Sequence, residues 1–465
     1  MKKNIKIMLG ATLLAVLIAL SSGCSQQRNY GEEYNYETDC QHSYYGNVNL
    51  WKKIQSDGAG QYILKNDYIY YYNTENKAMT PLCNKANCLH DMETDKSRRS
   101  DCNAYASVGS LKLIQYYDGY IYYFSSFEDG EIFCNTLYRV KKDGSEKDKI
   151  FTTDEELDVE DWLIHRGYLY YALKTYYYGE DESTQVYNKC ILKSLKLSSK
   201  MSEKKAKVIF ESDDKHTLIS FSRLKAYKNY LCYGITANEN DFEITTNESW
   251  LKQLYIPMYI YNIETGQNNE IPVPKGYSET TYIGRVAFLE DKMLFSVSDS
   301  TVNMHNDMYD LNYKLPIYSI NYDLTDEKIW LDDVEQGKLL QTYDDYVVLS
   351  DAQIQFFPYL FPEVVSDGDL QTDSSKLCTN VEIYSADAKR VSYFVYPMNV
   401  MGNFNGFGPD GVNVEFDEDD NSWSVYELNF KDVLNCHGEE VKLKRVSTRR
   451  FGPLNKEDYE GLAEN

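Results

Sequence analysis

Asn66-Asp67-Tyr68-Ile69-Tyr70-Tyr71 is a turn pair followed by a run of aromatic and β-branched residues. The pattern returns as DGYIYY at 118–123, RGYLYY at 166–171 and KNYLCY at 228–233, and weaker copies begin at Asp291, Asp344 and Asp410. Gly, Asn and Asp tolerate the tight or left-handed backbone that reverses a chain before a strand. The runs that follow have the composition of β-strands. The sequence therefore predicts repeated β-hairpins.

Most copies are followed by a second hairpin, such as the one that runs from Leu137 through Asp143-Gly144 to Phe151. Each repeat then holds about four short strands, the content of one β-propeller blade. A single such sheet cannot bury both of its faces, but blades stacked around a ring cover one another and leave few open edges. The seven copies predict an all-β fold, a β-propeller of seven blades of four antiparallel strands. Six or eight blades stay open because the ends of the repeat region are ragged.

Tyrosine is unusually frequent, with 44 copies in 465 residues. Most lie inside the predicted strands, where a large ring fills the wedge between blades and its hydroxyl reaches the rim. Three consecutive tyrosines, Tyr176 to Tyr178, are expected in a polar loop and are candidates for another role.

The N-terminus has the three parts of a signal peptide: Lys2, Lys3 and Lys6, an uncharged run over 7–20, and small residues. The run is too short to span a bilayer as a helix, which needs about 20 residues. It ends in LSSGC at 20–24, which resembles the bacterial lipobox, with Ser21 where leucine is commonest. That resemblance implies cleavage before Cys24 and a diacylglycerol on its thiol. An ordinary signal peptide with an incidental cysteine is the alternative.

These features predict four regions. Residues 1–23 are the signal peptide, 24–45 a lipid-anchored polar tether, 46–450 a single propeller domain and 451–465 a C-terminal tail. The predicted location is the extracytoplasmic face of the cell membrane. Removing residues 1–23 takes away three lysines and no acids, which changes the net charge from −24 to −27. Such a surface repels phosphate backbones, so nucleic acid is not an expected partner. A monomer is expected.

Cysteine and histidine gather in one segment: Cys83 and Cys88 are followed by His90 and then by Cys102. The chain here resembles a group of uncharacterised propeller lipoproteins from anaerobic Gram-positive bacteria, which carry a similar Leu-Cys-x4-Cys-x-His segment and then Cys-Asn-Ala. The resemblance implies a propeller fold and a surface location, and it implies no activity.

Three chemical interpretations of this segment remain open. Two of the three thiols can form a disulfide in an oxidising exterior. Three thiols and His90 also make a Cys₃His set of the kind that closes a structural zinc site. Free thiols in an anaerobic niche are the third. The role is structural in each case, and the other cysteines, from Cys40 to Cys436, are scattered singly.

The remaining motifs predict no catalytic residues. The acidic run Asp417–Asn421 could bind calcium, but it lacks the spaced acids and glycine of an EF-hand and is better explained as a hairpin tip. There is no Gly-x-Ser-x-Gly, no His-Glu-x-x-His and no Gly-rich phosphate loop.

The leading hypothesis is thus a non-catalytic binding or scaffold module for an envelope protein, peptide or glycan. One alternative is an extracellular polysaccharide lyase or hydrolase that uses carboxylates in loops, namely Asp241, Glu243, Asp307 and Asp310. The other is an envelope sensor or assembly factor.

Overall fold

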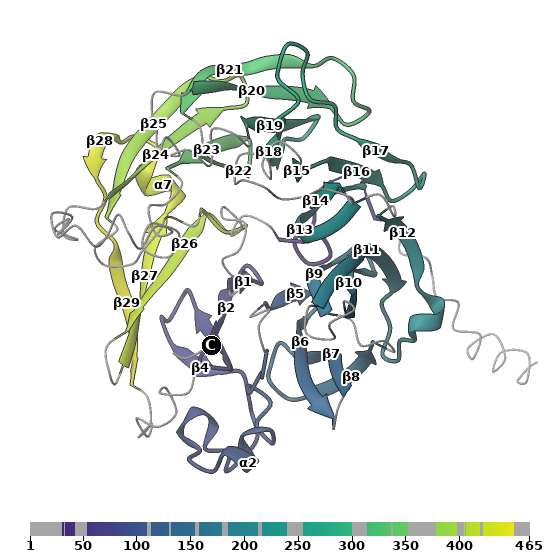
Figure 1. Cartoon of the computed structure of the whole chain (residues 1–465). Coiled ribbons are helices and arrows are strands. Elements are labelled where there is room, and N and C mark those ends of the chain that lie inside the picture. Colours follow the sequence, from purple (N-terminus) through teal and green to yellow (C-terminus); the bar gives the residue numbers. More distant parts are fainter. Residues whose placement is uncertain are drawn as a thin grey trace, which may run out of the picture. The chain divides into compact units, whose positions relative to one another are not determined.

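Seven antiparallel sheets follow one another along the chain in the computed structural model (Figure 1). The structure describes residues 30–31, 33–41, 54–108, 113–129, 132–153, 158–178, 185–212, 216–239, 254–299, 314–335, 338–351, 378–397, 404, 406–418 and 422–450. Helix is confined there to single turns: η1 (His90–Met92), α2 (Lys96–Arg99), η2 (Glu203–Lys205) and α7 (Phe430–Val433). None of the helices in these ranges is long and apolar enough to cross a membrane.

Blades 1 to 3 are meanders of four strands. Blade 1 holds β1 (Ile54–Ser56), β2 (Gly60–Lys65), β3 (Tyr68–Asn73) and β4 (Met79–Pro81). Blade 2 holds β5 (Gln115–Tyr117), β6 (Tyr120–Asp129), β7 (Ile132–Lys141) and β8 (Lys147–Thr152). Blade 3 holds β9 (Asp158–His165), β10 (Tyr168–Tyr178), β11 (Gln185–Lys196) and β12 (Lys207–Glu211).

Blades 4 and 5 keep this order, with one short extra strand. Blade 4 holds β13 (His216–Tyr227), β14 (Tyr230–Glu239), β16 (Met258–Asn262) and β17 (Asn268–Glu270), and β15 (Leu254–Tyr255) also pairs with β14. Blade 5 holds β18 (Thr281–Phe288), β19 (Lys292–Asp299), β20 (Lys314–Asn321) and β21 (Lys328–Glu335).

Blade 6 gains a fifth strand from the chain segment between two strands of blade 7. Blade 6 holds β22 (Leu339–Tyr343), β23 (Tyr346–Ser350), β24 (Cys378–Ser385) and β25 (Arg390–Pro397), and β28 (His437–Glu440) joins it in parallel to β25. Blade 7 holds β26 (Val412–Glu418), β27 (Ser422–Asn429) and β29 (Lys444–Arg450). The chain therefore leaves blade 7 after β27, pairs with blade 6 and returns, which ties the last two blades together.

Shared hydrophobic clusters show that the sheets form a closed ring. One cluster is common to each of the pairs 2–3, 3–4, 4–5, 5–6 and 6–7. A further cluster joins blades 7, 1 and 2, because it contains Val425 of blade 7, Ile63 of blade 1 and Ile121 of blade 2. The predicted seven-bladed propeller is confirmed, with three strands described in the seventh blade.

The tyrosines of the repeats pack between blades, as the sequence predicts. Eight of them, Tyr62, Tyr70, Tyr72, Tyr116, Tyr123, Tyr171, Tyr233 and Tyr396, are among the largest side chains that are completely buried. Several donate their hydroxyl to a carboxylate, as Tyr62 does to Asp57 at 2.9 Å and Tyr171 to Glu203 at 2.8 Å. The ring fills the wedge while the hydroxyl reaches a polar partner.

One expectation about the repeats was wrong. Tyr176 to Tyr178 do not lie in a loop: they end β10 and pair with 185–187 of β11. The turn at Asn66-Asp67 joins the second and third strands of its blade, whereas those at Asp118 and Arg166 join the first and second. Local turn chemistry is the same in all three places, with left-handed φ angles of 48°, 47° and 46° at the first residue. It therefore cannot show which hairpin of a blade a turn closes.

A polar segment ahead of blade 1, Tyr34–Gln41, packs against four blades, and we call it the strap. The Gln41 amide donates to the Ser56 carbonyl at 2.6 Å and accepts from the Ser56 N–H at 2.9 Å. The turns of blades 2 and 3 donate to the strap, since the N–H groups of Asp118 and Arg166 bond to carbonyls of the strap at 2.7 and 2.8 Å. Tyr34 stacks on Tyr227 of blade 4. This segment falls within the predicted tether, whose end at residue 45 stays a prediction.

The centre of the strap is a buried ion pair. The Asp39 carboxylate accepts from Arg166 Nε at 2.9 Å and from Arg166 Nη2 at 3.1 Å, and the two side chains are 1% and 2% exposed. The Cys40 N–H donates to Nδ1 of His165, whose Nε2 lies 2.6 Å from the Lys228 carbonyl. Burial lowers the pKa of His165 to about 4, so the ring is neutral and carries its proton on Nε2.

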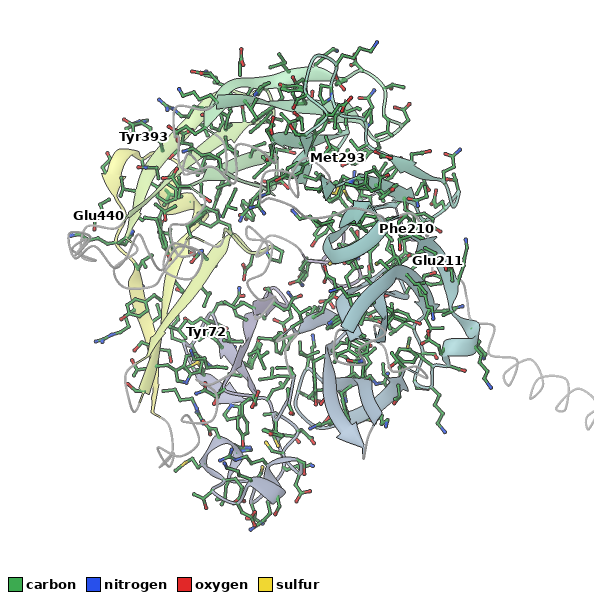
Figure 2. The ribbon with its side chains drawn as sticks, viewed as in Figure 1. Tyr72, Phe210, Glu211, Met293, Tyr393 and Glu440 are labelled. Carbon is green, nitrogen blue, oxygen red and sulfur yellow. The ribbon has the colours of Figure 1, made fainter. Side chains whose placement is uncertain are left out.

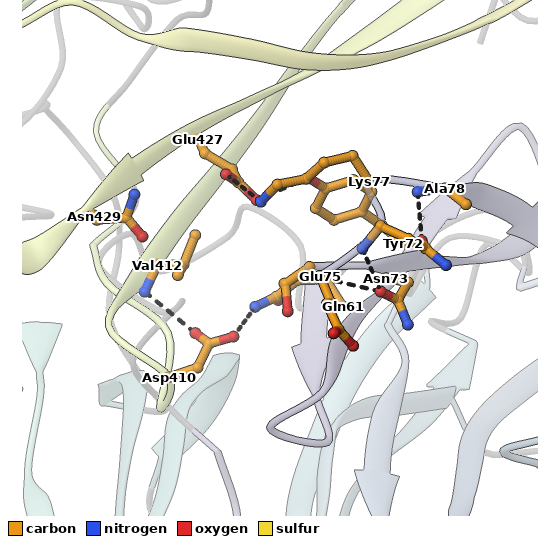
Figure 3. Close-up of polar contacts among 12 residues, drawn as sticks. Gln61, Tyr72, Asn73, Glu75, Lys77, Ala78, Asp410, Val412, Glu427 and Asn429 are labelled. Atoms are coloured by element: carbon orange, nitrogen blue, oxygen red, sulfur yellow. Dashed lines mark hydrogen bonds and ion pairs between the residues drawn. The ribbon is translucent and has the colours of Figure 1, made fainter.

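Polar pairs hold the seam between blades 1 and 7 (Figure 3). Lys77 Nζ lies 2.9 Å from both oxygens of the buried Glu427 carboxylate, which also accepts from the Tyr72 hydroxyl at 2.8 Å. Tyr72, labelled in Figure 2, thus connects β3 to β27. The Asp410 carboxylate accepts from Ser56 at 3.1 Å and from Gln61. The first and last blades are therefore joined by charged groups as well as by apolar contact.

Removing the cation of the strap pair should destabilise the fold strongly. Arg166→Met leaves the Asp39 carboxylate buried without its partner, and we expect a loss of about 3–5 kcal/mol in the free energy of unfolding. The double variant Asp39→Asn, Arg166→Met should be more stable than the single one, because a buried amide costs less than a buried charge. Urea unfolding followed by fluorescence measures both. Equal stabilities of the two variants would contradict a buried pair.

The seam carboxyl Asp410 should make stability depend on pH. Burial raises the pKa of Asp410 from 3.8 to about 6, against the opposing effect of its hydrogen bonds. Because the folded state binds this proton more tightly than the unfolded chain, the stabilising contribution is complete below about pH 4 and is lost as the pH rises through about 6. Asp410→Asn removes the titration. Its stability relative to the natural chain should therefore rise between about pH 4 and 7, and a constant difference would refute the assignment.

Candidate metal centre

The cysteine and histidine residues lie in the long connection between blades 1 and 2. Cys83 comes two residues after β4, Cys88 directly precedes Leu89 and η1, and Cys102 comes three residues after α2. The middle of the connection has little apolar packing, since Leu89 and Met92 are 54% and 56% exposed, whereas its ends are buried at Leu82 and Ala104. Backbone hydrogen bonds within successive turns hold this part of the chain, such as the one that the Cys102 N–H donates to the Arg99 carbonyl at 3.0 Å.

The structure brings the four predicted residues together. One ligand atom from each of Cys83, Cys88, His90 and Cys102 lies within 4.8 Å of all the others. Cys102 Sγ is 3.6 Å from His90 Nδ1. His90 and Asn87 both have left-handed backbones, with φ of 55° and 62°. Non-glycine residues adopt this conformation at a cost, and it turns the chain back so that the imidazole meets the sulfurs.

The thiols of Cys83, Cys88 and Cys102 are free. Burial raises the pKa of the Cys102 thiol far above its ordinary value, and the neighbouring Cys83 raises it further. Burial also acts to raise the pKa of Cys83, but hydrogen bonds from the backbone at Lys85 and Asn103 outweigh it and lower that pKa. Burial lowers the pKa of His90, which favours the neutral imidazole that a metal ion binds.

Residues of blade 2 pack against one side of the cluster. The Asn103 amide donates to the Gly144 carbonyl at 2.8 Å, and the Asn84 N–H donates to the same carbonyl at 3.2 Å. Lys147 Nζ lies 2.7 Å from the Tyr105 carbonyl and 3.5 Å from that of Cys102. Burial lowers the pKa of Lys147 to about 8, while the nearby Cys102 opposes that shift.

Blades 1 and 7 hold the other side. The buried carboxylate of Asp91, next to His90, accepts from Arg449 Nε and Nη2 at 2.7 Å each and from the Tyr70 hydroxyl at 3.0 Å. Arg449 lies in β29 of blade 7, and Tyr70 lies in β3 of blade 1. The Arg449 guanidinium also stacks over the Tyr70 ring, 5.1 Å from its centroid. Sequence analysis missed these supporting residues, because their partners are separated by up to 358 positions.

Cys24 and the loop acids Asp241, Glu243, Asp307 and Asp310 lie outside the described residues. The acidic run at 417–421 does join the paired strands β26 and β27, as expected of a hairpin, and its tip is likewise outside them. Cys232 is 1% exposed within blade 4 and packs there as a small buried hydrophobe.

The fold and the cluster define a seven-bladed propeller with a Cys₃His group at its first connection. No family model and no curated protein matches the chain. Among solved structures it is similar to an oligogalacturonate lyase in complex with manganese, with 10% identity and a TM-score of 0.45 over 85% of this chain and 91% of that one. It is also similar to the oligogalacturonate lyase of Vibrio parahaemolyticus, with 11% identity and a TM-score of 0.43 over 85% of this chain and 92% of that one. A prolyl endopeptidase is similar over 97% of this chain and 56% of its own (9%, 0.43). These likenesses concern the general fold, and at such scores they carry no argument about activity.

Two glycines test the packing of the cluster on blade 2. A Cβ on Gly144 would lie 2.7–2.8 Å from backbone atoms of Leu82 and Cys83, whereas a Cβ on Gly119 would meet nothing within 4 Å. Both have left-handed φ angles, 72° and 81°, so alanine costs roughly 1 kcal/mol of backbone strain at either site. Gly144→Ala should lower the free energy of unfolding, measured in urea, by about 1–3 kcal/mol more than Gly119→Ala does. Faster reaction of Cys83 with a thiol reagent should accompany it. Equal losses would show that the contact has no energetic weight.

Proposed function

We propose that this chain is a lipoprotein anchored by lipid on Cys24 at the extracytoplasmic face of the membrane. Its propeller acts as a non-catalytic binding or scaffold module for an envelope protein, peptide or glycan. The resemblance to propeller lipoproteins of anaerobic Gram-positive bacteria supports the proposal, as do the lipobox-like LSSGC and the signal-peptide pattern before it. The module is monomeric and, at its strongly negative charge, does not bind nucleic acid.

The strap is the observation that carries the proposal. Cys24 precedes Tyr34, the start of the strap, by ten residues, which reach at most about 35 Å when extended. The strap is fixed to blade 3 by the Asp39–Arg166 pair and to blade 1 by the bonds of Gln41 to Ser56, and it also contacts blades 2 and 4. An anchor at Cys24 would therefore keep Tyr34, where the strap begins, within about 35 Å of the bilayer. A propeller held close to the membrane in this way suits a surface binding module.

A structural zinc ion on Cys83, Cys88, His90 and Cys102 belongs to the same proposal. Four protein ligands fill a tetrahedral zinc site and leave no open position for substrate, so the ion would have no catalytic role.

Anchoring is tested in cells that express the full chain. Cys24→Ser should abolish incorporation of a labelled fatty acid and release the propeller from the membrane fraction, while Cys436→Ser, a distant and half-buried cysteine, should change neither. Two acyl chains give stable anchoring, so the expected change in the membrane-bound fraction is nearly complete. Unchanged labelling of Cys24→Ser would rule out this anchor.

The binding role is tested with the purified mature chain on glycan arrays and with defined envelope peptides and proteins. We expect saturable binding to one class, with the ligand recovered unchanged. Cleavage of a polysaccharide, lost when Asp241, Glu243, Asp307 or Asp310 is replaced by the corresponding amide, would overturn the non-catalytic role in favour of a lyase or hydrolase.

A further inference from the structure

The Cys₃His cluster has one edge of the length expected in a tetrahedral zinc site, and its cysteines are not bonded to one another. Zinc binds thiolate sulfur at about 2.3 Å and imidazole nitrogen at about 2.0–2.1 Å, so the sulfur–nitrogen edge of a tetrahedron is about 3.5 Å. The observed separation of Cys102 Sγ and His90 Nδ1 is 3.6 Å, and the largest separation among the four atoms is within 4.8 Å. A disulfide requires about 2.05 Å between sulfurs, and the three thiols are free.

We infer that the thiolates of Cys83, Cys88 and Cys102 and Nδ1 of His90 bind one zinc ion, and that this ion fastens the connection 82–106 across the junction of blades 7, 1 and 2. The inference rests on the structural zinc ion of the proposed function. It goes further by naming the ligand atoms and by giving the ion a role in closing the propeller ring.

The contacts beside three of the ligands reach three blades in all. Next to Cys83, backbone atoms touch Gly144 of blade 2, and next to Cys102 the Asn103 amide donates to the same glycine. Next to His90, Asp91 pairs with Arg449 of blade 7 and with Tyr70 of blade 1. An ion that fixes the four ligands relative to one another therefore also fixes three blades relative to one another.

The middle of the connection gains most from such a fastening, because the residues that are buried in the core, such as Leu82, Ala104 and Ala106, lie at its ends. Leu89 and Met92, its large apolar side chains around η1, are more than half exposed, and η1 and α2 are single turns without a buried residue. Short segments without a core of their own are commonly folded by a bound metal, whose binding free energy becomes folding free energy. The left-handed backbones of Asn87 and His90 are then stabilised by the coordination that they make possible.

The lysines around the cluster have the charge opposite to that of a zinc ion bound by three thiolates. Zinc with three thiolates and a neutral imidazole carries a net charge of −1. Two lysines lie against the cluster: Lys147 bonds to the carbonyls of Cys102 and Tyr105, and Lys85 bonds to the carbonyl of Asp101 at 2.5 Å. Second-shell groups of this kind orient the ligands and balance their charge.

Metal content is measured on the mature chain purified with reductant. We expect one zinc per chain, and replacement by Co²⁺ should give the visible absorption of tetrahedral thiolate coordination. His90→Ala and Cys88→Ser should lose the ion, His90→Cys should retain it because Cys₄ also binds zinc, and Cys436→Ser should behave as the natural chain. If the variants fail to fold, the natural chain is treated with a chelator and its reactive thiols are titrated in parallel. Three further thiols should become reactive for each zinc ion released.

The fastening is measured by hydrogen exchange with and without a chelator. Zinc removal should raise exchange by roughly tenfold or more in 82–106 and in β29, and leave blades 4 and 5 unchanged. A chain without zinc, or with a disulfide between two of these cysteines after purification without reductant, overturns the metal site and with it the fastening. Zinc that binds and leaves β29 unaffected on removal overturns only the fastening. Neither result bears on the anchor at Cys24.

Discussion

Each blade of this protein has two faces rich in aromatic and aliphatic side chains. These faces are buried only if a neighbouring blade covers each of them. The constraint is satisfied around the ring by six shared hydrophobic clusters, and the last of them joins blades 7, 1 and 2. The junction of blades 7 and 1 brings together segments from the two ends of the domain. It is also where charged groups concentrate, with Glu427 held by Lys77 and Asp91 held by Arg449. Apolar contact alone is tolerant of sliding, whereas these pairs fix one register between the two blades.

The abundance of tyrosine has a consequence for the acidic residues. A buried tyrosine ring brings a hydroxyl donor with it, and an unpaired donor in the interior is costly. Carboxylates supply the acceptors: Asp57, Asp91, Glu427, Glu37 and Glu203 each accept from a tyrosine of the repeats. Burial and these acceptors together raise the pKa of the tyrosines, so their hydroxyls stay protonated as donors. Part of the strong negative charge of the chain therefore serves the packing between blades.

Sequence alone could predict what depends on neighbours in the chain. Turn pairs and aromatic runs gave the strands and the number of blades, and the spacing of Cys83, Cys88 and His90 located the cluster. What could not be predicted depends on pairs far apart. Nothing in the polar segment around Asp39 shows that this carboxylate will form a buried ion pair with an arginine 127 residues later. The one available hint was Arg166 itself, because a long charged residue stands in the left-handed position that glycine or asparagine usually occupies. Its side chain is needed for the ion pair.

The strap and the connection that carries the Cys₃His cluster both join several blades through buried polar groups. These groups are the Asp39–Arg166 pair in the strap and the Asp91 carboxylate in the connection. The Asp39–Arg166 pair closes a loop of 127 residues, whereas Lys77–Glu427 closes one of 350. Because loop-closure entropy grows with the logarithm of length, the longer closure costs about 0.9 kcal/mol more. Contacts made by the strap involve only blades 1 to 4, so they do not require the seam between blades 1 and 7. Closing the seam between blades 1 and 7 must offset the longer closure, and the charged pairs Lys77–Glu427 and Asp91–Arg449 lie at that junction.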